Sequence, residues 1–323
     1  MRLPGFLGMR RKFRELRAEL SYKSASQPKG NTHLKPFLES LAAPASTVET
    51  FVKWHKEAWQ PLEYLVYLVY RELLKPGGTA VDGGAHAGMH TEGMARSVYP
   101  NGWVHAIEPS RDTLKRFKAN VGEANWDHIV LHEVALSDKD GEAEFISYPS
   151  NPAVSGLRVA PMFGDKEPPS EKYLVPIRRL DGLLADAARK DARMLRSVDL
   201  MKFDLEGWEL NALRGFEQQF VTQRPYLIFE FSGETDPSQR EILSWLWQRN
   251  FIVFDNFFRL VDENYLIERT DIVGKMSLNF VAVHPTRLQA VEAAAHRIHM
   301  ELERTSLDFI KLATERHFRP GYC

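Results

Sequence analysis

Short apolar runs alternate with amphipathic stretches through most of the chain after residue 78. The runs are bounded by turn-forming residues and predict buried strands, whereas the stretches with apolar residues at helical spacing predict helices. The predicted strands cover residues 79–81, 103–107, 129–134, 198–203, 226–229, 251–254 and 278–283. The predicted helices between them cover residues 88–98, 111–121, 208–213 and 237–249. Strands and helices alternating in this way predict an α/β fold with a largely parallel sheet covered on both faces.

Three further regions have patterns of their own. Apolar residues recur at helical spacing over residues 52–74, up to a Pro-Gly-Gly sequence, and predict one helix. Residues 149–176 contain many prolines and no clear period, so we expect a long irregular excursion, either a lid or a plain surface loop. An apolar stripe within residues 286–318 predicts a helix that packs against the main domain.

Acidic residues stand at the ends of four predicted strands. They are Asp82, Glu108, Asp204 and Glu230. Ligands of parallel α/β sheets bind beyond the carboxyl ends of the strands, near the point where strand order reverses. We therefore expect these acids to line one site.

The loop after the first strand, VDGGAHAGMHT, indicates which ligand that site takes. It has the pattern D-x-G-x-x-x-G from Asp82 through Gly84 to Gly88, whereas a dinucleotide loop would have glycine where His86 stands. A phosphate-binding P-loop would need Gly-Lys-Ser/Thr, which this stretch lacks. The pattern favours a nucleoside without a phosphate to bind, namely S-adenosylmethionine. The glycines would let the backbone approach the cofactor, and Glu108 would accept hydrogen bonds from its ribose hydroxyls.

Six segments in order carry a family resemblance. They read VDGGAHAG, AIEPSRDTLKRFKANV, VALSDKDGEAEF, RRLDGLL, DLMKFDLEGWELNALRGF and RPYLIFEF. In this order the segments resemble the FkbM-type methyltransferases. The resemblance implies the Rossmann-like, seven-stranded, mostly parallel sheet of class I methyltransferases, S-adenosylmethionine as cofactor, and methylation of hydroxyls on sugars or other small natural products. This chain departs from the family by carrying His86 in place of the usual Asn and Arg179 in place of the usual Thr.

The expected division of the chain follows from these patterns. We expect an N-terminal extension, a methyltransferase domain and a C-terminal helical extension, at residues 1–50, 51–285 and 286–323. The extension at the N-terminus would hold a basic amphipathic helix over residues 10–20 and a polar linker over 21–31. Within the domain, residues 79–137 would form the cofactor half and 138–285 the acceptor half.

The expected cofactor contacts come from the loop, the second strand and the third. They are Asp82, Gly84, Ala85, His86, Gly88, Glu108, Pro109 and Ala135. Asp82 would bind the cofactor's ammonium directly or through water, and Ala135 would lie beside the adenine. His86 would bind the cofactor's carboxylate, act as a base, or simply sit in the turn. Lys202 would reach a carboxylate such as Asp82 or Glu230.

The acceptor hydroxyl needs a general base, because an un-ionised hydroxyl is a poor nucleophile. Asp204 is the leading candidate, and Glu206 and Glu230 are the next. The same three acids could instead hold a divalent cation such as Mg²⁺ that orients the acceptor. Glu206 could also cap the helix that follows it. The four remaining histidines of this region, His90, His105, His128 and His132, have no ligand spacing and are expected at the surface or behind the site.

Composition limits the partners. Lys and Arg number 42 against 43 Asp and Glu, so no net charge attracts nucleic acid. Cys323 alone builds no disulfide framework. The N-terminus has no apolar stretch long enough for a signal peptide, and residues 62–74 are too short to span a bilayer, so we expect a cytoplasmic protein.

The partner is then a small hydroxyl acceptor, and the terminal helices could join copies into a homo-oligomer. Two alternatives are an NAD-type oxidoreductase and a cofactor-binding domain without catalysis.

Overall fold

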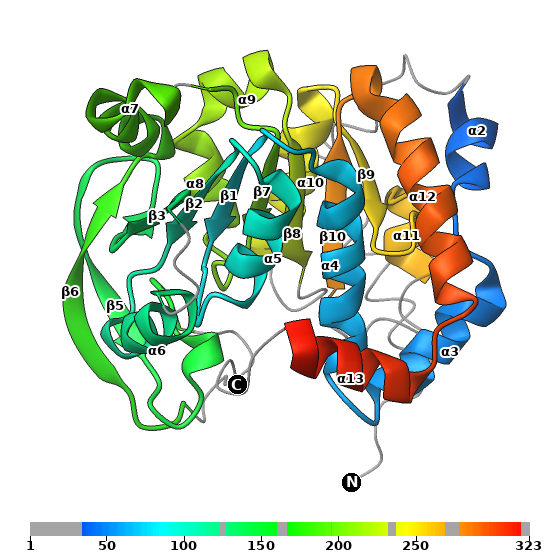
Figure 1. Cartoon of the computed structure of the whole chain (residues 1–323), viewed down its shortest axis with the longest axis horizontal. Helices are drawn as coiled ribbons and strands as arrows, with labels where there is room; N and C mark the ends of the chain where they lie inside the picture. Colours follow the sequence, from blue (N-terminus) through cyan, green and yellow to red (C-terminus); the bar gives the residue numbers. More distant parts are fainter. Residues whose placement is uncertain are drawn as a thin grey trace, which may run out of the picture.

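The computed structural model describes residues 34–122, 127–159, 167–194, 196–231, 237–268 and 278–317. Its main sheet has the order β3-β2-β1-β7-β8-β10-β9 (Figure 1). These strands are β1 (Thr79–Gly83), β2 (Trp103–Ile107), β3 (Ile129–His132), β7 (Leu200–Phe203), β8 (Tyr226–Phe231), β9 (Ile252–Asp255) and β10 (Leu278–Val283). All neighbours pair in parallel except β10, which runs antiparallel to both β8 and β9. The predicted fold class is therefore confirmed.

Helices pack on this sheet and on one another. They are α2 (Lys35–Ser40), α3 (Ala45–His55), α4 (Gln60–Leu73), α5 (Met89–Val98), α6 (Arg111–Gly122), α7 (Leu180–Lys190), α8 (Glu209–Arg214), α9 (Glu217–Gln223), α10 (Pro237–Gln248), α11 (Glu263–Glu268), α12 (Leu288–Leu302) and α13 (Leu307–His317). In Figure 1, α4 and α5 lie in front of the sheet, and α5 contacts both β1 and β2. No helix among these described residues is both long and apolar enough to cross a membrane.

The single helix predicted over residues 52–74 is wrong, because the chain forms two helices there. The first, α3, ends at His55, and α4 starts at Gln60 after a short turn. Pro61 lies in the first turn of α4, where its fixed φ and missing N–H suit a helix start and oppose a continuous helix. The break matters because it places the beginning of α4 beside the cavity described below.

The irregular excursion predicted over residues 149–176 is also partly wrong. Residues 171–178 form β6, which pairs antiparallel with β5 (Gly141–Ser147) and parallel with β4 (Ala135–Leu136) in a second sheet. Only Val175 and Ile177 of β6 are buried, so too few apolar positions alternate to indicate a strand. Residues 160–166 of the excursion lie outside the described residues. The same holds for the N-terminal helix and linker predicted within residues 1–33, and for Cys323.

The C-terminal helices pack against α4, as expected for the apolar stripe (Figure 1). The stripe residues Leu288, Val291, Ala295, Ile298 and Leu302 are all buried. The division of the chain into an extension, a domain and a second extension stays a prediction.

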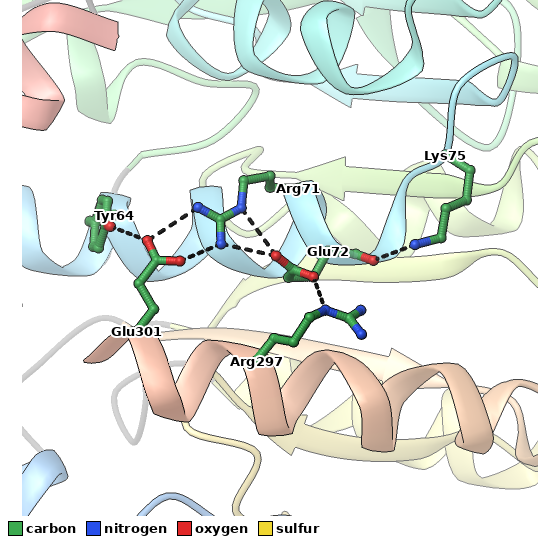
Figure 2. Close-up of polar contacts among 6 residues, drawn as sticks. All are labelled: Tyr64, Arg71, Glu72, Lys75, Arg297 and Glu301. Atoms are coloured by element: carbon green, nitrogen blue, oxygen red, sulfur yellow. Dashed lines mark hydrogen bonds and ion pairs between the residues drawn. The ribbon is translucent and has the colours of Figure 1, made fainter. Parts of the chain in front are cut away.

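Polar contacts also tie α12 to α4 (Figure 2). The Glu301 carboxylate accepts hydrogen bonds from the Tyr64 hydroxyl at 2.5 Å and from Arg71 Nη2 at 2.5 Å. One turn away, Arg297 Nε donates to Glu72 Oε2 at 2.5 Å. These bonds hold α4 in register with α12.

Candidate active site

A cavity of about 570 Å³ opens where β1, β2 and β7 end. Its walls come from the start of α4, the β1–α5 loop, the end of β2, strand β4, the loop after β5 and the turn after β7. The predicted site residues that line it are Gly84, Ala85, His86, Glu108, Pro109, Ala135, Asp204 and Glu206. Asp82, Gly88 and Glu230, which were also predicted, lie outside this lining. The fold thus brings most of the predicted residues to one place.

The glycine loop folds back onto the end of β2. The backbone N–H groups of Gly84 and Ala85 both donate to the Ile107 carbonyl at 3.0 Å. Gly84 has φ +75°, and a Cβ at this position would lie 1.9 Å from the Asp204 carbonyl oxygen. A Cβ at Gly88 would instead lie 2.3 Å from Val121 Cγ2 on α6. The packing of the protein itself therefore demands both glycines, and Gly88 serves the contact with α6.

Glu108 accepts hydrogen bonds from the glycine loop and can accept more from a ligand. Its Oε2 accepts from the His86 backbone N–H at 2.9 Å and its Oε1 from the Ser110 N–H at 2.8 Å. An ionised carboxylate has about four acceptor positions, so each oxygen keeps one for a further donor. Burial raises the pKa of Glu108 to about 7, against the lowering effect of the two backbone hydrogen bonds.

His86 and Asp82 carry polar atoms that protein groups leave unsatisfied. His86 has φ +48°, and its buried Nε2 has no hydrogen-bond partner among the described residues. Burial, and then the nearby Arg116, lowers the pKa of His86, so the ring is neutral at pH 7. Asp82 is fully buried; its Oδ2 accepts from the Thr91 hydroxyl at 2.6 Å, and its Oδ1 has no partner in the part of the chain that the structure describes. His86 thus brings spare hydrogen-bonding capacity to the cavity, and Asp82 carries it just outside the lining.

The three predicted acids come together after β7 and in β8. Asp204, Glu206 and Glu230 each present one carboxylate oxygen, and these oxygens lie within 4.8 Å of one another. Burial alone would raise the pKa of Asp204, but the Lys202 ammonium and a hydrogen bond with Glu230 outweigh it and lower this pKa. Burial, with repulsion from Asp204 and Glu209, raises the pKa of Glu206 to about 8. The cluster therefore holds an ionised Asp204 beside a protonated Glu206 at neutral pH.

The turn that carries these acids has an unusual backbone. Glu206 has φ +53° and Gly207 has φ +86°, both in the left-handed region. Arg158 Nε donates to the Glu206 carbonyl at 2.8 Å from the loop after β5. The Glu209 carboxylate accepts from the Leu205 and Gly207 N–H groups at 2.9 and 3.1 Å. Glu209 rather than Glu206 thus stabilises the start of α8, and the Glu206 side chain faces the cavity.

Lys202 pairs with one of the clustered acids, which the sequence does not indicate. Its side chain is only 3% exposed, and Nζ lies 3.2 Å from Asp204 Oδ2. Burial would lower the pKa of Lys202, but Asp204, Asp82 and Glu63 together raise it, so the ammonium stays charged. In sequence, Lys202 stands between apolar strand residues, where it gives no sign of which carboxylate it pairs with.

Several lining residues were not predicted as site residues, among them Trp59, Glu63 and His90. His90 does not lie at the surface, which was one of its two expected positions. It is 6% exposed, and its Nε2 lies 2.8 Å from Glu63 Oε2. His105 is likewise buried, with Nδ1 3.1 Å from Nε2 of His132. Spacing along the chain could not reveal the Glu63–His90 pair, because it joins two helices.

Comparison with known proteins shows which protein family the chain resembles. A model of the methyltransferase FkbM domain matches residues 82–253, just over half of the 323 residues. The chain is 28% identical to Methyltransferase 1 of Beauveria bassiana over 151 residues, covering 43% of this chain and 58% of that protein. It is 26% identical to the 2-O-methyltransferase NoeI of Sinorhizobium fredii over 212 residues, covering 62% of this chain and 76% of NoeI.

Two other similarities are more limited. The AMB antimetabolite synthetase AmbE of Pseudomonas aeruginosa is 24% identical over 227 residues, and the chain covers 10% of its length. The chain therefore spans less than two thirds of the Beauveria and Pseudomonas relatives. The solved structure of methyltransferase FkbM from Methylobacillus flagellatus KT aligns with a TM-score of 0.41 at 15% identity, over 79% of this chain and 60% of that one.

The matched segment runs from Asp82 at the end of β1 to Val253 in β9. It therefore includes the glycine loop, Glu108 and all three clustered acids. The sheet order, with a single antiparallel strand, is the one expected for class I methyltransferases. The chain belongs to the FkbM family of S-adenosylmethionine-dependent methyltransferases.

Proposed function

We propose that the protein transfers the methyl group of S-adenosylmethionine to a hydroxyl of a sugar or another small polyhydroxylated metabolite. The observation that carries the proposal is one cavity with a nucleoside-binding wall, Gly84 to Glu108, and a wall of clustered carboxylates around Asp204. The name of one relative, 2-O-methyltransferase NoeI, supports an oxygen acceptor. The family assignment speaks against the NAD-type oxidoreductase that the loop also allowed.

The cofactor wall fits a nucleoside. The cavity volume of about 570 Å³ lies in the usual range of small-molecule sites, roughly 300–1,000 Å³. Glu108 would accept hydrogen bonds from the ribose hydroxyls through the lone pairs that His86 and Ser110 leave free. The unpartnered Nε2 of His86 would meet a polar group of the cofactor, and the small side chain of Ala135 leaves room beside the base.

The bound sulfonium would supply an activated methyl group, and the protein has to align the acceptor oxygen and take up its proton as the C–O bond forms. Asp204 would accept the hydroxyl proton on its carboxylate. Lys202 would keep Asp204 ionised through the 3.2 Å ion pair. A low pKa suffices for this base, because the hydroxyl becomes strongly acidic as its oxygen bonds to carbon. Glu206, protonated at neutral pH, would donate a hydrogen bond to the acceptor.

We propose further that this transfer requires no divalent cation. The three carboxylates lie close enough to share one. However, the Lys202 ammonium lies 3.2 Å from Asp204 Oδ2 and already offsets part of the negative charge of the cluster. A cation would therefore gain less attraction here than from three carboxylates without a paired ammonium. Dialysis against EDTA should leave the rate unchanged, and a loss restored by Mg²⁺ would establish the metal alternative.

Calorimetry and transfer assays test the main proposal. S-adenosylhomocysteine should bind and NAD(P)⁺ should not. Labelled S-adenosylmethionine should mark members of a panel of sugars and other polyhydroxylated compounds. Asp204→Asn should abolish transfer while binding S-adenosylhomocysteine as the wild type does, and Asp191→Asn, an exposed surface pair with Arg193, is the matched control. Binding of the cofactor without transfer to any hydroxyl would favour a domain that has lost catalysis.

A further inference from the structure

The beginning of α4 contributes a wall of the cavity that lies outside the family match. Trp59 and Glu63 line the cavity together with His90 of α5. The matched segment begins at residue 82, so the two α4 residues belong to a part of the chain that the family model does not cover. We propose that Trp59, Glu63 and His90 form the acceptor subsite and that this subsite holds a sugar ring stacked on Trp59. The inference rests on the proposed function and specifies its substrate class.

The three side chains lie beside the proposed reaction centre. Trp59 and Glu63 are four residues apart at the first turn of α4, so they project from the same side of the helix. Glu63 bonds to His90 at 2.8 Å, and the charge of Glu63 contributes to the raised pKa of Lys202. His90 in turn contributes to the lowered pKa of Asp204. Because this wall and Asp204 line the same cavity, an acceptor resting on the wall shares the cavity with the proposed base.

The chemistry of the wall matches a sugar ring. Trp59 is 41% exposed although it lines a cavity, which leaves the indole available to a ligand. The face of an aromatic ring carries negative charge density and attracts the weakly positive C–H groups on the less polar face of a sugar. The Glu63 side chain is 31% exposed and keeps acceptor positions beyond its bond to His90. A ring that stacks on Trp59 can therefore donate its edge hydroxyls to Glu63.

Contacts with α12 hold α4, and with it this wall of the cavity, in place. Figure 2 shows Tyr64 and Arg71, which follow Trp59 on the same helix, bonded to Glu301 of α12. The next pair along, Arg297 with Glu72, adds a second tie at 2.5 Å. A wall fixed in this way loses little conformational freedom when a ligand binds, which favours affinity. The C-terminal helices thus gain a role in acceptor binding through α4.

Saturation-transfer NMR tests the subsite on the full chain loaded with S-adenosylhomocysteine. The probes are the methyl glycosides of glucose, mannose, galactose, xylose, rhamnose and fucose. At least one should receive saturation, with the strongest transfer to the C–H protons of one ring face. Trp59→Ala should weaken binding of that glycoside at least about fivefold, and Trp59→Phe should weaken it less. Glu63→Gln should weaken it as well, because the amide accepts hydrogen bonds less strongly than the carboxylate.

The controls separate the subsite from the fold and from the cofactor site. Tyr99→Ala removes an aromatic side chain that is 60% exposed and does not line the cavity, so glycoside binding should be unchanged. Every variant should bind S-adenosylhomocysteine as the wild type does. The subsite is overturned if no glycoside receives saturation from the wild type, or if Trp59→Ala binds the glycoside unchanged.

The transfer assay distinguishes this failure from failure of the proposed function. Methylation of a hydroxyl compound that is not a sugar, equally fast in Trp59→Ala, would keep O-methyl transfer and overturn the subsite. Absence of S-adenosylhomocysteine binding by the wild type would overturn both.

Discussion

The buried carboxylate of Glu108 makes cofactor binding depend on pH. Its pKa in the folded protein is raised to about 7, and its ordinary value is 4.5. A ribose hydroxyl donates to the ionised form, so binding weakens as protons occupy Glu108 below pH 7. With one titrating group the dissociation constant rises by roughly tenfold between pH 8 and pH 6. Glu108→Gln cannot ionise and should bind weakly and with a flat pH dependence.

The same shift has a consequence for the stability of the protein without cofactor. Between pH 4.5 and about 7, Glu108 holds a proton in the folded state and has lost it in the unfolded state. The free energy of unfolding therefore falls as pH rises through this window, and the stability present below pH 4.5 is lost above about 7. A difference of 2.5 pH units corresponds to about 3 kcal/mol. Cofactor binding above pH 7 would offset this loss by ordinary linkage.

Calorimetric titration with S-adenosylhomocysteine at pH 6, 7 and 8 and constant ionic strength measures the effect. Glu144→Gln is the matched control, since this carboxylate is 58% exposed on β5 and pairs only with Lys172 in the described contacts. It should keep the wild-type pH dependence. An affinity of the wild type that is constant from pH 6 to pH 8 would refute the reasoning. So would a Glu108→Gln variant that keeps the wild-type slope.

Three further substitutions test the site. Gly84→Ala places a Cβ 1.9 Å from the Asp204 carbonyl at a positive φ and should lower stability by about 2–4 kcal/mol in denaturant titrations. Gly122→Ala, whose added Cβ meets no described atom within 4 Å beyond its own helix backbone and chain neighbours, should leave those titrations unchanged. Lys202→Met should raise the pKa of Asp204 and move the acid limb of the kcat/KM profile to higher pH, whereas an unmoved limb would separate Lys202 from the base. Glu206→Gln, which copies the protonated carboxyl, should keep transfer at pH 7 within about tenfold of the wild type, and a loss as large as that of Asp204→Asn would assign the base to Glu206.

The sequence was most informative where one chemical requirement acts on neighbouring residues. The central strands β1, β2 and β7 are short and mostly apolar because their residues are all buried, and this pattern is visible without the structure. The acids Glu108 and Asp204 follow such runs, so parallel pairing alone brings them to one edge. That is why the fold could be predicted, and why most of the predicted site residues line the cavity.

The sequence was least informative where contacts join distant segments with weak local patterns. Strand β6 buries only Val175 and Ile177, too few positions for a periodic signal. Glu63 and His90 meet across two helices, and each looks like an ordinary polar position of an amphipathic helix. The pairing of Lys202 with Asp204 depends on a side chain turning along its own strand toward the cavity. Packing of the whole chain decides these contacts, and no short window of sequence contains them.

The environment of Asp204 and Glu206 explains how two neighbouring carboxyls can have different roles. They are two residues apart and burial alone would raise the pKa of both, yet the pKa of Asp204 is lowered and that of Glu206 is raised to about 8. Lys202 and a hydrogen bond with Glu230 lower the pKa of Asp204, whereas repulsion from Asp204 and Glu209 adds to the effect of burial on Glu206. Carboxyls whose pKa values are driven apart in this way are suited to act one as base and the other as hydrogen-bond donor. Arg158 of the loop after β5, which bonds to the Glu206 backbone, lowers the pKa of Glu206 and so acts against this separation without reversing it.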